Sequence, residues 1–431
     1  RKGHTWENSL QYRSSTEDQF SLFEEAFFDA DFELTGQALL EQRAANVEAE
    51  KSLLFQSDYT YPFGEEGKLE AGLRSSFRRI DNDYLVEEFF DATWNRLANL
   101  SNDFNYDEDI HALYANVGNK INKFSYQLGV RVEHSRVLTE LLQTGEENDR
   151  TYTNIFPSAF MTYELPNENN IQVSYSRRLR RPRFWDLNPF FTFSDSRNIF
   201  RGNPNLDPEF TNSFELSHIK YWDKGSISSS AYYRSSTGVI ERIISFQEED
   251  GELLTVRQPE NLATEDAYGF EFIYSYDPYK WWRINGSANF FRSIVDGRNF
   301  SEDLYQDAIA WFTRVNSRIT IKKEYDLQVR ADYRAPQNTT QGRRKSITRI
   351  DLGMSKDVFQ KKGTLTISLR DIFNSARYRS ESFGPTFYSE SNYQRRPRQL
   401  TATLNYRLNQ KKRRGGNRGG RGDGGFEGGE F

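Results

Sequence analysis

Apolar and polar residues alternate with a period of two along much of the chain. In one stretch the apolar face is Phe124, Tyr126, Leu128, Val130 and Val132, and the intervening residues are Ser, Gln, Gly, Arg and Glu. This is the pattern of a strand with one apolar and one polar face. The same alternation recurs in 69–78, 268–276, 282–290, 325–334, 365–369 and 400–408.

The pattern predicts an all-β protein built from about sixteen antiparallel strands, with no helical domain. The predicted strands are 3–15, 51–62, 68–80, 104–119, 122–137, 150–165, 169–183, 210–222, 226–246, 259–277, 280–294, 306–322, 325–336, 345–356, 363–373 and 397–408. A soluble antiparallel sheet with one solvated face would show the same alternation. Its strands average about 5–6 residues, however, whereas these reach the length that a tilted strand needs to cross a bilayer.

Aromatic residues near the strand ends also favour a transmembrane β-barrel. Tyr59 and Tyr61, Tyr274 and Tyr276, and Trp281 and Trp282 lie where interfacial aromatic girdles are expected. The connections alternate between tight turns, such as 62–67, and long loops, such as 81–103 and 184–209. Outer-membrane barrels have short periplasmic turns and long extracellular loops. On this basis the first strand runs outward, and the sixteen strands are expected to belong to a barrel of 22, the size that holds a plugged lumen.

Composition removes several other classes of protein. The 431 residues include no Cys and only four His, so thiolate and His-rich metal sites are not expected, and no cofactor is predicted. A formal net charge of −5 argues against a general nucleic-acid binder. No apolar run approaches the roughly 20 residues of a transmembrane helix. No nucleophile elbow, phosphate loop or zinc-helix motif is present in the sequence, so we do not expect an enzyme.

One region carries a specific resemblance. Residues 174–182 read SYSRRLRRP, residues 187–190 read LNPF, and residues 202–209 read GNPNLDPE; residues 58–62, 68–72, 156–159 and 369–374 agree with the same family. In this order the motifs resemble the outer-membrane β-barrel family, whose members are TonB-dependent-receptor-like proteins of Gram-negative bacteria. The resemblance covers about 51–408.

The resemblance implies a location in the outer membrane, in contact with its lipid. It also implies a barrel of 22 strands that is filled by an N-terminal plug domain and opened through the TonB system. The expected function is ligand uptake through the plugged lumen. The alternative is a non-transporting barrel that scaffolds a surface or assembly complex. The chain begins without Met or a signal peptide and contains no plug, so we interpret residues 1–408 as the barrel portion of a longer protein.

The densest positive run within this portion provides the first candidate contact residues. Arg177, Arg178 and Arg180 lie next to Arg181 and Arg183, and guanidinium groups can hold an anionic ligand, a lipid phosphate or plug carboxylates. Alternation places Arg178 and Arg180 on one face, and Arg177 and Arg181 on the other. The competing interpretation is a structural ladder with acids such as Asp186 and Glu215.

The segment 184–210 provides the other candidates, Asn188, Phe190 and Asn203, as contacts of a ligand or of the plug. Its prolines can instead fix a folded loop that caps the barrel wall. The acidic and aromatic segment 16–50 is predicted to be an extracellular loop containing a helix-capable run, Gln37–Glu50. The sharper hypothesis for this loop is that it docks a surface lipoprotein. Its carboxylates lack the spacing of a calcium loop. Residues 409–431 are predicted to be a flexible Gly/Arg-rich tail that does not bind RNA.

Overall fold

The computed structural model describes residues 3–37, 39–189, 192–193, 198–249, 252–322, 324–360, 362–384 and 387–408. The predicted tail, 409–431, lies outside the described residues. Nineteen strands form one sheet, and when the short strands β4, β9 and β10 are left aside, sixteen make its wall. Within the described chain no helix is long and apolar enough to span a membrane.

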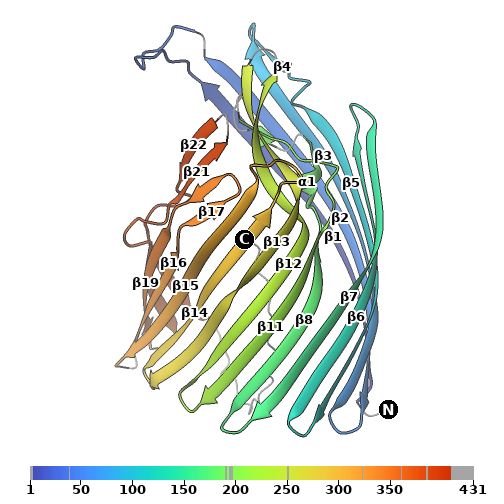
Figure 1. Cartoon of the computed structure of the whole chain (residues 1–431). Coiled ribbons are helices and arrows are strands. Elements are labelled where there is room, and N and C mark those ends of the chain that lie inside the picture. The colour runs from blue at the N-terminus through green and yellow to red at the C-terminus, as the bar shows by residue number, and fades with distance from the viewer. Residues whose placement is uncertain are drawn as a thin grey trace.

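The wall is a simple antiparallel meander in which each strand pairs with the next wall strand along the chain (Figure 1). Its strands are β1 (Thr5–Glu25), β2 (Leu40–Phe63), β3 (Gly67–Phe90), β5 (Asn102–Ile121), β6 (Phe124–Leu141), β7 (Glu146–Leu165), β8 (Asn169–Arg180), β11 (Glu209–Trp222), β12 (Gly225–Glu249), β13 (Glu252–Tyr279), β14 (Trp282–Asp296), β15 (Tyr305–Ile321), β16 (Tyr325–Arg334), β19 (Ile347–Val358), β20 (Gly363–Arg370) and β23 (Gln399–Tyr406). The predicted strand number and order are therefore confirmed.

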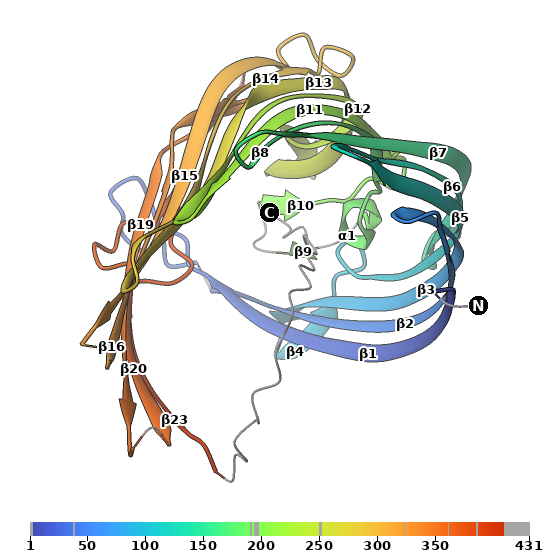
Figure 2. The same ribbon diagram turned by 90° about the horizontal axis from the view of Figure 1, so that it is seen from below.

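Viewed along the strands, the wall curls around a lumen (Figure 2). Among the described residues, β1 pairs only with β2 and β23 only with β20, so these two strands are the edges of the curled sheet. Tight turns at 64–66, 122–123, 166–168, 223–224 and 280–281 gather at one end of the wall, which we call the turn end. The opposite end, which carries the longer excursions, is called the loop end.

At the turn end and along the middle of the strands, apolar side chains point away from the lumen. Register places Leu73, Leu113, Val132 and Ile155 in one row across β3, β5, β6 and β7, with exposed fractions of 38%, 66%, 39% and 54%. The rings of Tyr279 and Trp281 stack 5.1 Å apart at the turn end. Apolar outer faces flanked by aromatic residues are the pattern of a transmembrane wall, because the lipid replaces water on that side.

The outer face becomes polar at the next row toward the loop end, Ser75, His111, His134 and Thr153, which we call the boundary row. The strands continue well beyond it. We call the part of each strand past this level the loop-end half. There, Arg79 lies on the outer face and binds Asp107 and Asp109 at 3.0 and 2.9 Å.

These strand extensions correct several sequence predictions. The segment 16–50 is not a long loop with a helix, because β1 reaches Glu25, β2 begins at Leu40, and the two pair throughout. Cross-strand pairing on both sides of β2 overrides the helix propensity of its Ala and Glu residues. Likewise β3, β6, β7, β12 and β13 occupy much of the predicted loops 81–103, 138–149 and 247–258.

A second, four-stranded sheet lies at the loop end of the later strands (Figure 1). It contains β17 (Gln337–Thr339), β18 (Gly342–Arg344), β21 (Tyr378–Gly384) and β22 (Phe387–Tyr393). The excursion that carries β21 and β22 begins at a turn in which Asp371 and Asn374 have positive φ angles of 48° and 53°. The Asn374 side-chain oxygen accepts hydrogen bonds from Gln394 and from the Arg398 backbone, at 2.8 and 3.0 Å, and so closes the base of the excursion.

Candidate functional site

Between β8 and β11 the chain leaves the wall and enters the lumen. We call residues 181–208 the lumenal loop. It contains the single-turn helix α1 (Phe184–Leu187) and the short strands β9 (Thr192–Phe193) and β10 (Asn198–Phe200). These elements lie inside the ring of wall strands (Figure 2). Pro182 lies two residues past the end of β8, and its missing N–H is compatible with the end of the ladder at Arg180.

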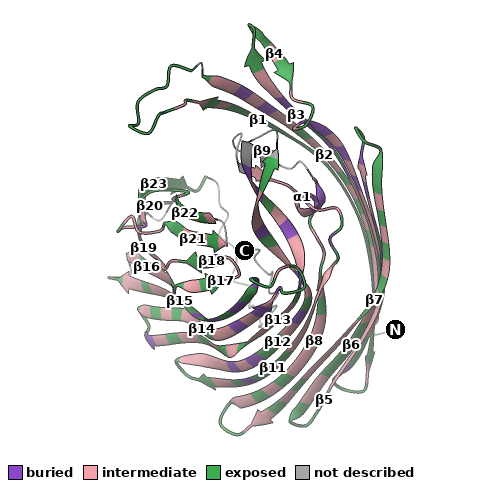
Figure 3. Cartoon of the chain, turned by 45° about the horizontal axis from the view of Figure 1, so that its top comes forward, coloured by how far each residue is buried: buried purple, intermediate pink, exposed green. Residues whose placement is uncertain are grey.

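The lumenal loop packs against the inner face of the loop-end half. Phe184, Leu187 and Leu206 of the loop form one buried apolar cluster with residues of the wall. The wall residues of this cluster are Ile80, Phe104, Tyr106, Val137 and Leu141. The Phe184 ring lies 5.8 Å from the ring of Phe104 and 5.9 Å from that of Tyr106. A cavity of about 20 Å³ between Val137, Leu187 and Leu206 has room for little more than a water molecule. In Figure 3 buried positions occur on α1 and on the wall strands near it.

A chain of asparagine side chains ties the end of α1 to the wall. Asn188, 1% exposed, donates to Asn82 at 3.1 Å and accepts from Asn102 at 3.4 Å. Asn82 in turn donates to Asn46 at 2.5 Å, so β2, β3, β5 and the loop share one polar network. Buried amides are costly unless they are hydrogen-bonded, and this network provides partners for most of the amide groups within an otherwise apolar contact. The side-chain oxygen of Asn102 is the exception, since it is buried and has no hydrogen-bond partner among the described residues.

The other side of the loop is held by β13. Strand β10 pairs with β13 in parallel, with Ile199 opposite Val256. The Asn203 amide donates to the Pro259 carbonyl at 3.3 Å and to the Glu260 carboxylate at 3.0 Å. Pro259 and Glu260 both lie in the loop-end half. Burial raises the pKa of the Glu260 carboxyl group, although the hydrogen bond from Asn203 acts to lower it. The loop is therefore fixed at both sides of the lumen.

The arginine run divides between three environments. Arg180 pairs with Glu209 at 2.8 Å, and Arg181 pairs with Glu133 at 2.5 Å. Arg178 is exposed on the lumenal face and has no hydrogen bond or ion pair with another described residue. Arg177 points to the outer face, and its guanidinium lies 5.1 Å from the ring centroid of Phe210.

The predicted structural ladder is thus present in part, but with other partners. Asp186 binds Arg242 at 3.3 Å, and Glu215 accepts a hydrogen bond from Ser217 at 2.6 Å. Arg181 does not share the outer face with Arg177, because β8 ends at Arg180 and the chain then turns inward. The partners Glu133 and Glu209 come from other strands, and no local sequence signal pairs them with the arginines.

The six candidate residues therefore do not form one site. Arg178 and Arg180 lie on the lumenal face, Arg177 lies outside, and Asn188 and Asn203 hold the lumenal loop in place. Phe190 lies outside the described residues. Sequence reasoning missed the contacts between the loop and the wall. A signal was present, because the face that is polar in 70–78 becomes apolar at Ile80, Tyr84 and Val86, which indicates a change of environment.

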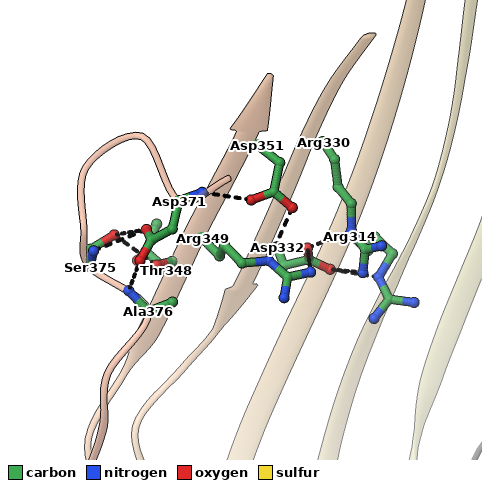
Figure 4. Close-up of polar contacts among 9 residues, drawn as sticks. All are labelled: Arg314, Arg330, Asp332, Thr348, Arg349, Asp351, Asp371, Ser375 and Ala376. Atoms are coloured by element: carbon green, nitrogen blue, oxygen red, sulfur yellow. Dashed lines mark hydrogen bonds and ion pairs between the residues drawn. The ribbon is translucent and has the colours of Figure 1, made fainter. Parts of the chain in front are cut away.

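On the opposite side of the lumen, charged side chains form a connected network (Figure 4). Asp332 accepts hydrogen bonds from Arg314, Arg330 and Arg349 at 2.6, 2.7 and 3.0 Å. Arg349 also contacts Asp351 at 3.3 Å, and Asp351 accepts from the Asp371 backbone N–H at 2.8 Å. The Asp371 carboxylate then caps the turn at Ser375 and Ala376. Charges inside the wall are thus largely neutralised by one another.

A wall of long antiparallel strands with an apolar exterior, a charged lumen and an in-folded loop defines the outer-membrane β-barrel class. The chain belongs to the outer membrane protein β-barrel family, whose model matches residues 1–406, and its location is the Gram-negative outer membrane. The predicted resemblance to TonB-dependent-receptor barrels is confirmed at the level of fold.

Solved structures agree with this assignment. The ferric-catecholate import receptor Fiu from E. coli K12 has a TM-score of 0.65 at 12% identity, covering 94% of this chain and 62% of its own. The copper transporter OprC gives 0.61 at 13% identity, with 91% and 65% covered. The ferric yersiniabactin uptake receptor FyuA from Yersinia pestis gives 0.59 at 12% identity, with 92% and 58% covered. The chain therefore spans about three fifths of the structures it matches. No curated protein matches it in sequence.

Proposed function

We propose that the chain forms most of the wall of an outer-membrane uptake receptor of the TonB-dependent type. The observation that carries the proposal is the lumen itself, which has a charged lining and is narrowed toward the loop end by a folded loop. A ligand entering from the loop end meets the lumenal loop before it reaches the wall charges. The solved proteins of the same fold, which are described as import receptors, uptake receptors and transporters, support this function.

Arg178 is the residue of the wall that we assign to contact with a ligand or with a plug domain. It is exposed to the lumen below the lumenal loop, and its guanidinium has no carboxylate partner among the described residues. A carboxylate of a plug or an anionic ligand would supply that partner, because arginine binds carboxylates and phosphates through two parallel hydrogen bonds. Arg180, exposed by 54% and paired with Glu209, lies next to it on the same face.

The test reverses these charges in the full-length protein in cells. We expect Arg178→Glu with Arg180→Glu to loosen plug seating or weaken ligand binding by about tenfold, the value of one charge-assisted contact. Entry of vancomycin, which is too large for ordinary porins, reports plug seating. Uptake of a ligand identified by co-purification would report transport, measured with and without TonB.

Arg298→Glu is the control, since Arg298 pairs with Asp296 at the loop end, away from the lumen wall. Unchanged vancomycin entry and unchanged uptake in the double variant would reduce the arginine run to a structural ladder. Uptake that continues without TonB would contradict the transport proposal.

A scaffolding role is the second candidate, and one observation favours it. The small sheet at the loop end exposes four aromatic residues, Tyr378, Phe383, Tyr388 and Tyr393, by 55%, 53%, 65% and 58%. Tyr378 and Tyr393 form one cross-strand pair, and Phe383 and Tyr388 form another on the opposite face of the hairpin. Exposed aromatic residues are typical of protein interfaces. Under this alternative, a surface complex that co-purifies with the protein would persist in cells without TonB and would be lost when Tyr388 and Tyr393 are replaced by Ser.

A further inference from the structure

The wall contains a seam between β7 and β8. The two strands pair only from Ser158 opposite Ser176 down to Leu165 opposite Asn169. Beyond Ser158, β7 continues to pair with β6 as far as Glu146, and β8 continues to pair with β11 as far as Arg180. Within the described chain, no backbone hydrogen bond joins β7 and β8 in this upper part.

A proline in β7 explains why β7 and β8 separate. The next residue of β7 after the last pair is Pro157, which has no N–H to donate to a ladder. Proline in a strand is therefore confined to an edge, and here it faces the point where β8 departs. Ile155, 54% exposed on the outer face, lies just past Pro157 and still belongs to the apolar belt. The seam thus opens within the outer edge of the belt and continues past the boundary row.

The lumenal loop closes the seam from the inside. Asp207 forms an ion pair with Arg150 of β7, and Asn205 accepts from Asn148 at 3.1 Å. What remains is a groove of about 580 Å³ that spans the seam. Its lining comes from β7, from the end of the lumenal loop and from the start of β11, and includes Asp149, Arg150, Thr151, Asn154, Asp207 and Phe210.

The charge at this groove is not balanced. Asp149 is paired with Arg136 at 2.7 Å, and Asp207 is paired with Arg150. Arg177 lies over the ring of Phe210, a lining residue, and has no ion pair with any described residue. Its Nε atom is buried and lacks a hydrogen-bond partner in the described structure. The Arg177 guanidinium lies beside an aromatic ring at the edge of the apolar belt and has no anionic partner within the described chain. Because a partly buried charge is costly when it is unpaired, we expect an anion from outside the chain to bind it.

We propose that the seam between β7 and β8 binds a lipid A molecule of the outer leaflet, with one phosphate on Arg177. The position favours a lipid over a soluble anion. On the outer face, Arg177 and Asn212 form one polar pair next to the apolar pair Tyr175 and Phe214 on its turn-end side. Acyl chains would lie on the apolar residues below, and the phosphate would reach the groove, where Thr151 on the outer face of β7 offers a further polar group.

The experiment measures lipid A bound to the full-length protein extracted from outer membranes in mild detergent, by native mass spectrometry. We expect Arg177→Gln to lower the bound lipid A at least about tenfold, because a charge-assisted phosphate contact is lost. Arg177→Lys keeps the charge but not the two-pronged geometry, and should retain an intermediate amount. Arg136→Gln is the matched control, since Arg136 also points to the outer face but already has a carboxylate partner.

A second arm identifies the phosphate as the recognised group. Lipid A added to the delipidated protein should raise the melting temperature of the wild type and not that of Arg177→Gln, because only the form with a site is stabilised by ligand. Dephosphorylated lipid A and free inorganic phosphate should have little effect. Equal stabilisation by dephosphorylated lipid, or equal retention by Arg177→Gln and the wild type, would overturn the proposal.

Discussion

The two halves of the same strands have opposite polarity. Along β3 in the belt, Leu69 and Leu73 point outward, and Glu70 and Arg74 point into the lumen. Past the boundary row, Asp81 and Asp83 occupy the outer face, while Ile80, Tyr84 and Val86 are 1%, 6% and 0% exposed on the inner face. The backbone register with β5 is unbroken from Lys68 to Tyr84, so the side chains keep alternating while their polarity is exchanged.

The exchange follows the surroundings of each half. In the belt, lipid lies outside and the charged lumen inside, so apolar residues face outward. In the loop-end half, polar side chains cover the outer face and the lumenal loop covers part of the inner face, so the residues under the loop are apolar, as in a soluble sheet with one covered side. The loop-end half therefore depends on the lumenal loop for its core, and the belt does not. Three substitutions test this difference.

The largest effect is expected where a charge is placed in the covered inner face. Ile80→Asp would bury a carboxylate against Phe104 and Phe184, at a cost on the order of 5 kcal/mol, and so release the lumenal loop. Arg74→Asp places the same residue on the same face of β3 but in the open lumen, and should cost less than about 1 kcal/mol. Cleavage within residues 181–208 by protease added to intact cells measures the release. Equal cleavage in both variants would mean that the two halves do not differ as described.

A smaller effect is expected from deleting the loop's main apolar contact. Phe184 is 2% exposed, and Phe184→Ala removes a buried aromatic ring, at a cost of about 3–5 kcal/mol. The belt offers a control in Phe290, 45% exposed on the outer face of β14, whose replacement by Ala should leave the loop protected. Hydrogen exchange of the backbone amides in 184–189 reports the docking of the loop. Unchanged exchange in Phe184→Ala would show that hydrogen bonds alone hold it.

Much of the belt could be predicted from the sequence, whereas the loop-end half could not. Alternation against lipid is continuous in 124–132, so the strand was evident there. In 81–86 the residues Asp81, Asn82 and Asp83 indicate a loop by composition, and only tertiary packing under the lumenal loop makes the region a strand. In 40–50, residues with helix propensity are held in β2 by pairing with β1 and β3. The pattern of residues within 40–50 alone does not show which strands will pair with it.

The site shows the same limit. The arginine run predicted charged contacts on two faces, and that division holds for Arg177 and Arg178 because it depends only on strand periodicity. The ion-pair partners Glu133 and Glu209 could not be predicted, since they depend on the inward turn after Arg180 and on the strand order. The role of Asn188 as an anchor required the positions of β3 and β5 relative to α1.

The smallest expected effect tests the asparagine network, which is the polar part of the same contact. Asn188→Ala should destabilise loop docking by about 1–3 kcal/mol, because the amides of Asn82 and Asn102 lose a buried partner. Since Asn82 and Asn188 share one hydrogen bond, replacing both by Ala should cost less than the sum of the single replacements. Exchange rates of the amides in 184–189 for the wild type, both single variants and the double variant complete the cycle. Strictly additive costs would show that the two side chains act independently, and the loop would then be held by its apolar cluster and by β13.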